Sequence, residues 1–185
     1  SILYMATGDA DGYDTYSIGV MKSLDGGQTW NETGLSFSVM DGERISRVIM
    51  DSQDHLTLLA ATSNGVYKTV DGGDNWYIVR NGSNSNFYHD LENVASEPDT
   101  WYLAAVGSGV YRSQDNGETW ASLNNGIPFG GGGIGRINVE MSESDPDQVY
   151  ALYANTSSGF YGMYKSFDGG DNWSLMSSQP NLLGW

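Results

Sequence analysis

The sequence has no cysteine among its 185 residues. This absence excludes disulfide bonds, thiolate catalysis and the zinc or iron–sulfur sites that need cysteine ligands. It also excludes a small extracellular scaffold held together by disulfides. No apolar stretch approaches the roughly 20 residues that a membrane-spanning helix requires, so we expect no membrane insertion. The first ten residues lack a basic segment and a long apolar core, so they are not a signal peptide; an export signal can lie outside this sequence.

Basic residues are scarce as well. Eight Lys and Arg stand against 23 Asp and Glu, which gives a formal net charge of −15. Nucleic-acid binding depends on Lys and Arg that neutralise phosphates, so the balance predicts no nucleic-acid partner. An anionic membrane surface is disfavoured for the same reason. Because the acidic residues are scattered, we assign most of the charge to acidic turns and a solvated surface.

Long helical patterns are also missing, and an eight-residue pattern repeats instead. Each copy has Ser or Thr, then Asp two residues later, a Gly-Gly or Asn-Gly pair, and a final Trp. The Asp–Trp pairs are Asp25 and Trp30, Asp71 and Trp76, Asp115 and Trp120, and Asp168 and Trp173. Successive aspartates are 46, 44 and 53 residues apart. A repeat of that length indicates an array of similar structural units.

Short β-rich runs separated by Gly, Asp, Asn and Ser predict an all-β fold. Aligned on the repeat, the second unit has four predicted strands, at residues 45–51, 56–62, 65–70 and 75–79. In the fourth unit, residues 142–148 are the predicted loop between the first and second strands. Four short antiparallel strands per 40–50 residues are typical of a β-propeller blade. We expect one propeller domain with about four blades: residues 1–34, which lack a first strand, then 35–80, 81–123 and 124–185. Since an open array leaves its end faces unburied, we expect these to belong to a larger propeller of six to eight blades in a longer chain.

The repeated pattern suits the hairpin between the third and fourth strands of a blade. A turn aspartate can accept hydrogen bonds from backbone N–H groups one to three residues on. The following glycine supplies positive φ at little cost, and the Trp buries a large ring, worth roughly 1.5–3 kcal/mol. Because a single active site does not need four copies, we predict a structural role for Asp25, Asp71, Asp115 and Asp168 and their tryptophans.

The pattern S/T-x-D-G/N-G-x-T/N-W resembles the Asp-box, or BNR repeat. That repeat occurs in sialidases, in xyloglucanase-type glycoside hydrolases, in sortilin-like propellers and in a photosystem assembly factor. The sequence is also similar to repeat proteins exported by the bacterial type IX secretion system, and this resemblance implies a secreted or cell-surface location. Sialidases use an arginine cluster and a Tyr nucleophile, and the five arginines here form no recognisable sialidase segment.

Loops on the face away from the repeated hairpins are the predicted site of function. There, exposed aromatic and charged side chains can contact a glycan or a protein. The candidate ligand-binding residues are Tyr13, Tyr16, Arg44, Phe87, Tyr88, His89, Phe129 and Tyr161.

Asp9, Asp11 and Asp14 form a D-x-D-G-x-D sequence. Carboxylates at alternate positions around a glycine resemble the start of a calcium loop. The distal glutamate of the full pattern is missing, so the alternative is an acidic loop without a cofactor. The same aspartates are candidates for the carboxylate of a glycosidase, which needs two such groups across the scissile bond.

Two functions follow from the sequence. The first is a non-catalytic, secreted or cell-surface propeller that presents a glycan- or protein-binding face. The alternative is a fragment of a xyloglucanase-like enzyme that cleaves polysaccharides.

Overall fold

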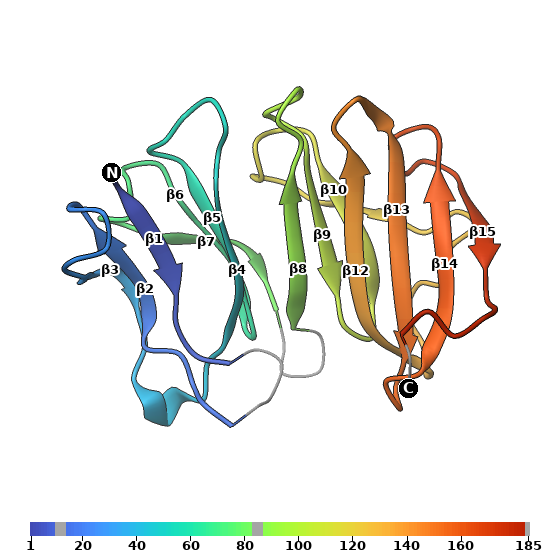
Figure 1. Ribbon diagram of the computed structural model, residues 1–185, viewed down its shortest axis with the longest axis horizontal. Coiled ribbons are helices and arrows are strands. Elements are labelled where there is room, and N and C mark those ends of the chain that lie inside the picture. The colour runs from blue at the N-terminus through green and yellow to red at the C-terminus, as the bar shows by residue number, and fades with distance from the viewer. Residues whose placement is uncertain (10–13, 83–86, 184–185) are drawn as a thin grey trace.

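The computed structural model describes residues 1–9, 14–82 and 87–183. Within them it has strands β1 to β15, arranged in four antiparallel sheets (Figure 1). We call these sheets blades 1 to 4. Blade 1 contains β1 (Leu3–Ala6), β2 (Gly19–Ser23) and β3 (Asn31–Ser36). Blade 2 contains β4 (Ile45–Met50), β5 (Leu58–Thr62), β6 (Gly65–Thr69) and β7 (Tyr77–Asn81).

Blades 3 and 4 repeat the same order of strands. Blade 3 contains β8 (Tyr88–Asn93), β9 (Trp101–Ala105), β10 (Gly109–Ser113) and β11 (Ala121–Leu123). Blade 4 contains β12 (Ile134–Ser142), β13 (Asp145–Asn155), β14 (Phe160–Ser166) and β15 (Trp173–Ser177). A short 3-10 turn, η1 (Val39–Asp41), precedes β4. The predicted all-β propeller fold with four-stranded antiparallel blades is therefore confirmed, and among the described residues blade 1 has three strands.

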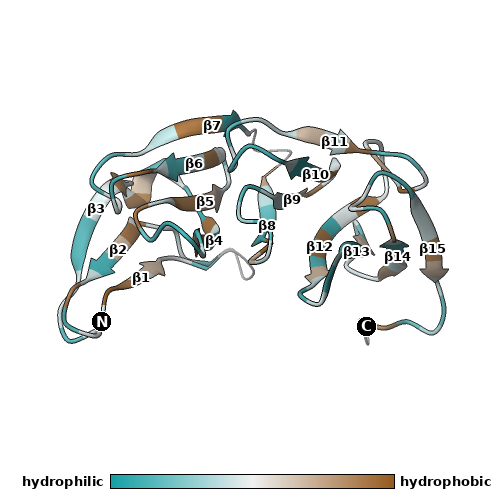
Figure 2. Cartoon of the chain, turned by 90° about the horizontal axis from the view of Figure 1, so that it is seen from above, coloured by the Kyte–Doolittle hydropathy of each residue, from teal (hydrophilic) through white to brown (hydrophobic). Residues whose placement is uncertain are grey.

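The blades stand side by side in an open arc (Figure 2). The first strands β4, β8 and β12 lie on the concave side, and the last strands β3, β7, β11 and β15 lie on the convex side. The core consists of three apolar layers, one between each pair of neighbouring blades. Hydrophobic burial is therefore between sheets, as a propeller requires.

The second strand of a blade is fully buried in blades 2 and 3, which have a neighbouring blade on each side. Every residue of β5 and β9 is buried, because a blade lies on each face and a strand on each edge. The equivalent strand β1 alternates between exposed and partly exposed residues, and Leu3 and Met5 are each 41% exposed. Blade 1 has no strand beside that edge and no blade before it among the described residues.

One predicted loop is mostly strand. Residues 142–148 are acidic and contain a proline, which favours a loop. In the structure β12 continues to Ser142 and β13 begins at Asp145, and these two residues pair directly. Backbone pairing between two long neighbouring strands therefore outweighs local turn preference, and only a two-residue turn remains.

The connections alternate between the two ends of the blades (Figure 1). The repeated hairpins lie at one end, together with the turns that join β4 to β5 and β8 to β9. The chain segments between blades and the turns that join second to third strands lie at the other end. No helix in the described part of the chain is both long and apolar enough to cross a bilayer.

Candidate functional site

Each repeated hairpin is held by its own aspartate. In blade 2, Asp71 Oδ1 accepts hydrogen bonds from the Thr69 hydroxyl at 2.8 Å and the Asn75 backbone N–H at 2.9 Å, and Oδ2 accepts from the Asn75 amide at 2.8 Å. Thr69 Oγ1 accepts from the Gly73 N–H at 3.0 Å, and the Trp76 indole donates to the Gly73 carbonyl at 3.1 Å.

The same aspartate contacts recur at Asp25, Asp115 and Asp168. The backbone N–H groups that donate to each aspartate belong to residues three or four positions later in the chain. The sequence analysis expected donors one to three positions later.

These contacts favour the ionised carboxylate. The backbone and side chain of Thr29 lower the pKa of Asp25 to about 2, and Asn75 does the same for the pKa of Asp71. Burial raises the pKa of Asp115, but hydrogen bonds from Thr119 outweigh it, so the net shift is downward. The Asn172 amide lowers the pKa of Asp168. All four carboxylates are therefore engaged within their own turns.

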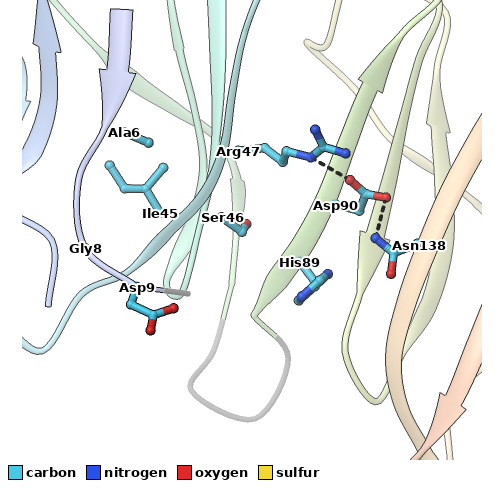
Figure 3. Close-up of a pocket in the computed structure, with 9 residues that line it drawn as sticks. All are labelled: Ala6, Gly8, Asp9, Ile45, Ser46, Arg47, His89, Asp90 and Asn138. Carbon is cyan, nitrogen blue, oxygen red and sulfur yellow. Dashed lines mark hydrogen bonds and ion pairs between the residues drawn. The ribbon is translucent and has the colours of Figure 1, made fainter. Parts of the chain in front are cut away.

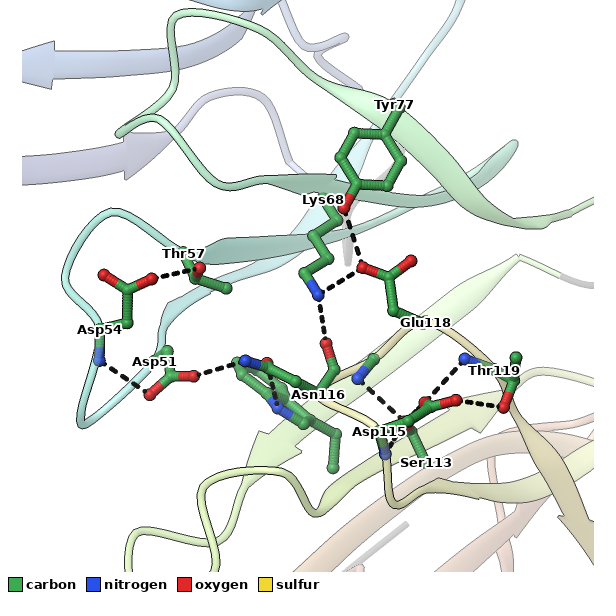
Figure 4. A network of polar contacts seen from close by, with 12 residues as sticks. Asp51, Asp54, Thr57, Lys68, Tyr77, Ser113, Asp115, Asn116, Glu118 and Thr119 are labelled. Atoms are coloured by element: carbon green, nitrogen blue, oxygen red, sulfur yellow. Dashed lines mark hydrogen bonds and ion pairs between the residues drawn. The ribbon is translucent and has the colours of Figure 1, made fainter.

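The hairpin of each following blade is also bound by a cation from the blade before it. Figure 4 shows this contact between blades 2 and 3. The buried Lys68 of β6 donates to the Asn116 carbonyl and the Glu118 carboxylate, both at 2.7 Å. Tyr77 donates to the same Glu118 at 2.9 Å, and the Asn116 amide donates to Asp51 at 3.0 Å. The end of the molecule with the hairpins is thus used for contacts between blades.

The other end of the inner strands lines a polar pocket of about 470 Å³ (Figure 3). Its residues come from blade 1, from β4 and β8, and from β12. They are Ala6, Gly8, Asp9, Ile45, Ser46, Arg47, His89, Asp90 and Asn138. Asp9 and His89 lie near the loop end of the pocket, while Arg47, Asp90 and Asn138 form a row across the three strands.

This row has a simple origin in the strand register. Arg47, Asp90 and Asn138 hold equivalent places on successive inner strands, because they pair with equivalent residues of the second strands, namely Ala61, Ala104 and Leu152. Arg47 Nε donates to Asp90 Oδ1 at 2.9 Å, and the Asn138 amide donates to Asp90 Oδ2 at 3.1 Å. Asp90 is 2% exposed and also accepts from the N–H groups of Leu91 and Val139. Its carboxylate therefore joins three blades and is not available as a catalytic acid or base.

A second carboxylate lies beside this row. Arg47 Nη2 donates to Glu92 Oε1 at 2.8 Å. The pKa of Glu92 is raised to about 7, chiefly by burial and also by Asp90 and Glu140, against the opposing effect of Arg47. The pKa of Arg47 is lowered by burial but raised more by Asp90 and Glu92. The inner surface therefore carries one arginine among three carboxylates, and one of these carboxylates changes protonation near neutral pH.

The structure brings only two of the predicted site residues, Asp9 and His89, into this pocket. Asp14, Tyr16 and Tyr161 are exposed. Asp11 and Tyr13 lie outside the described residues.

The remaining predicted ligand-binding residues pack inside the fold. Phe87 and Tyr88 are 8% and 3% exposed, and the Tyr88 hydroxyl donates to the Asn81 carbonyl at 2.8 Å. Phe129 packs edge-on against Tyr111, with ring centroids 5.5 Å apart. Arg44 lies over the Phe87 ring at 5.6 Å. These side chains seal the ends of the layers between blades, so their rings do not form the open aromatic surface that was expected.

Sequence reasoning missed Ser46, Arg47, Asp90 and Asn138. The signal that could have found the last three is positional, because each is a polar residue at the same place in the first strand of its blade. Within the described residues, no three His, Asp or Glu side chains are grouped so as to hold a metal ion. Calcium at Asp9, Asp11 and Asp14 stays a prediction.

A family model described as the BNR/Asp-box repeat matches residues 111–122, which include the third hairpin. The repeated hairpin is an Asp-box. A curated xyloglucanase from a Paenibacillus species is 25% identical over 186 residues, which cover 96% of this chain and 15% of that protein.

Two solved structures show a similar fold. An ancestral GH74 enzyme matches 97% of this chain and 23% of its own, with a TM-score of 0.75 and 19% identity. The GH74 enzyme of Niastella koreensis matches 95% of this chain and 27% of its own, with a TM-score of 0.70 and 23% identity. The chain thus spans 15% to 27% of the length of these relatives, and it shares the β-propeller fold with them.

Proposed function

We propose that this Asp-box propeller binds a neutral polysaccharide of the xyloglucan class in the pocket beside its inner strands. The supporting observation is the convergence of Asp9, Ser46, Arg47 and His89 on one pocket at the end remote from the Asp-boxes. Carboxylate, hydroxyl, guanidinium and imidazole groups are the donors and acceptors that recognise sugar hydroxyls. A xyloglucanase aligns with 96% of the chain at 25% identity. This alignment supports a plant-type β-glucan rather than a protein as the ligand.

Charge supports a neutral glycan over an acidic one. The net charge of −15 repels polyanions. The arginine in the pocket is already paired with Asp90 and Glu92, at 2.9 and 2.8 Å. It can therefore donate its remaining N–H groups to hydroxyls, but it is not an unpaired cation for a sugar carboxylate. Binding of polysaccharide fits the secreted or cell-surface location that the resemblance implies.

The test is calorimetric titration of the chain with xyloglucan oligosaccharides, cello-oligosaccharides and an acidic oligosaccharide. Asp9→Asn and His89→Ala are expected to weaken binding of the neutral ligands at least about tenfold, which corresponds to the loss of one or two hydrogen bonds. Asp14→Asn is the matched control, because Asp14 belongs to the same acidic segment but is exposed and does not line the pocket. Equal effects of Asp9→Asn and Asp14→Asn, or preference for the acidic ligand, would contradict the proposal.

The second candidate function is hydrolysis of the same polysaccharide. It is favoured by the xyloglucanase relative and by the position of Asp9, since Asp90 is fully engaged in contacts between blades. A glycosidase needs a second carboxylate about 5–9.5 Å away. Release of reducing ends that is abolished in Asp9→Asn, with binding retained, would support this candidate over simple binding.

A further inference from the structure

Arg80 is a half-buried cation between blades 2 and 3. Its guanidinium carbon lies 3.9 Å from the ring centroid of Tyr111 and 5.9 Å from that of Tyr88. Its Nε is buried and has no hydrogen-bond partner. Burial raises the pKa of Tyr88 and the nearby Arg80 lowers it, with burial the larger effect. Although the chain has 23 acidic residues, no ion pair between described residues includes Arg80.

A β-bulge places this side chain. β7 pairs with β6 through Tyr77 and Ile78, and the pairing then skips Val79 and resumes at Arg80. Val79 packs into the apolar layer between blades 2 and 3, and Arg80 reaches Tyr111 of blade 3. A bulge turns a side chain in a direction that a regular strand does not give, and bulges are frequent beside functional sites.

The layer between blades 1 and 2 has an apolar contact at the equivalent tyrosine. Tyr67 and Tyr111 are equivalent because each lies four residues before the aspartate of its Asp-box. The ring of Phe37 packs edge-on against Tyr67, with centroids 6.2 Å apart. An apolar ring completes such a layer without needing a polar partner. A guanidinium in this position loses hydration, and that loss is offset only when an acceptor binds it.

Arg80 lines a polar pocket of about 240 Å³, which we call the Arg80 pocket. The pocket also includes Asn81, Tyr88, Ser108 and Tyr111. The hydroxyls of Ser108 and Tyr111 are 2.6 Å apart. Only one of these two O–H groups donates in their mutual contact, so the other remains available to a ligand. The pocket therefore presents a cation and a hydroxyl donor together.

The Arg80 pocket is separate from the proposed glycan pocket. His89 lines the glycan pocket, while its neighbour Tyr88 lines the Arg80 pocket. The two pockets share no lining residue. A test of ligand binding at Arg80 therefore does not depend on the outcome for the glycan pocket.

We propose that the Arg80 pocket binds the carboxylate of a small monoanion, with Arg80 and the Ser108–Tyr111 hydroxyl pair as donors. A guanidinium held flat on an aromatic ring can offer two parallel N–H groups to the two oxygens of one carboxylate. The net charge of −15 favours a ligand with one negative charge over a dianion such as phosphate. Two sources carry this chemistry, namely a free small organic acid and a single acidic sugar.

The experiment is nuclear magnetic resonance titration of the 185-residue chain at constant ionic strength. The probes are acetate, methyl glucuronide, neutral methyl glucoside and inorganic phosphate. We expect the Tyr111 amide signal to shift with both carboxylates, with a Kd below about 10 mM, and not with the glucoside. Glucuronide binding at least about tenfold tighter than acetate binding identifies an acidic sugar as the source, and a smaller difference identifies a free acid.

Substitutions separate a specific site from general attraction by charge. Arg80→Met should weaken carboxylate binding at least about tenfold. Arg80→Lys should weaken it about threefold or more, because an ammonium group lacks the planar pair of donors. Lys165→Met is the matched control, because it removes one positive charge from a lysine that already donates to Gln148 at 2.6 Å. It should leave carboxylate binding unchanged, and thermal unfolding verifies that each variant folds.

Three results would overturn the proposal. One is the lack of a saturable shift of the Tyr111 signal up to about 100 mM acetate or glucuronide. Another is binding of the glucoside as tight as that of the glucuronide, or binding of phosphate tighter than that of either carboxylate. The third is full binding in Arg80→Lys, or an equal loss in Arg80→Met and Lys165→Met. The comparison of glucuronide with glucoside uses the parent chain, so it decides the matter even where a variant does not fold.

Discussion

Arg47 Nε lies 2.9 Å from Asp90 Oδ1, and this bond joins the inner strands of blades 2 and 3. The other oxygen of the same carboxylate accepts from Asn138 and the Val139 N–H of blade 4. One buried side chain thus holds three blades in register at the edge of the proposed glycan pocket. Stability and ligand binding are therefore coupled at this position.

Replacement of Asp90 by Ala should destabilise the fold by about 2–4 kcal/mol, because it leaves several donors without their acceptor. The lower part of that range is expected if water reaches Arg47, whose side chain is 45% exposed. Urea unfolding followed by tryptophan fluorescence measures the change. Asp14→Ala, at an exposed position, should stay within about 0.5 kcal/mol of the parent chain, and a similar small effect for Asp90→Ala would contradict this role.

Replacement of Lys68 by Met should also destabilise the fold, by about 1–3 kcal/mol. The Lys68 side chain is 4% exposed and donates to both Asn116 and Glu118. Its loss leaves the Asn116 carbonyl without this donor and leaves Glu118 with the Tyr77 hydroxyl alone. The same change at the less buried Lys22, where Tyr4 still donates to the Gly72 carbonyl, should cost less. Chemical unfolding of the two variants side by side shows which change lowers the free energy of unfolding more. A larger loss of stability in Lys22→Met than in Lys68→Met would refute this prediction.

Acid should weaken the Asp-boxes in a defined pH window. The pKa of Asp25 and of Asp71 is about 2, below the ordinary 3.8. The unfolded chain therefore binds protons first as pH falls, and the stability that the two carboxylates contribute is present above about pH 4 and is lost progressively toward pH 2. Melting temperatures measured from pH 5 to pH 2 should fall less steeply in the Asp25→Asn, Asp71→Asn double variant, which starts from a lower value at pH 5. An unchanged slope would contradict the assignment.

Glu92 should change the pH dependence of folding stability in the opposite direction. Its pKa is raised by burial from 4.5 to about 7. A raised pKa favours protonation in the folded state, so the stabilising contribution of Glu92 is complete below about pH 4.5 and is lost as pH rises through 7. Glu92→Gln should therefore flatten the decline in stability between pH 5 and pH 8 and melt higher than the parent chain at pH 8. A steeper decline in the variant would show that the ion pair with Arg47 dominates instead.

The repeat accounts for most of what could be predicted. The spacing of Asp25, Asp71, Asp115 and Asp168 predicted the repeated blade and the place of each hairpin. Local chemistry explains this success, because Asp, Gly and Trp at fixed offsets define one turn wherever they occur. The predicted loop at residues 142–148 failed because pairing between β12 and β13, which no local pattern contains, continued the strands through it.

The pocket was predicted only in part. Asp9 and His89 were candidates because they stand in irregular segments with reactive side chains. Phe87 and Tyr88 stand in the same kind of segment, yet they turn inward and close the layer between blades. Which way a loop aromatic points depends on the neighbouring blade, and that neighbour is about 40–50 residues away along the chain.

The sequence by itself determined the β class, the blade repeat and the structural use of the four aspartates, since each depends on residues within a few positions of one another. Only the tertiary structure decided that Arg47, Asp90 and Asn138 form one row. It alone decided that Lys22, Lys68 and Arg112 reach the hairpin of the next blade. These relationships join residues 43 to 59 positions apart, and they exist only once neighbouring sheets pack in register.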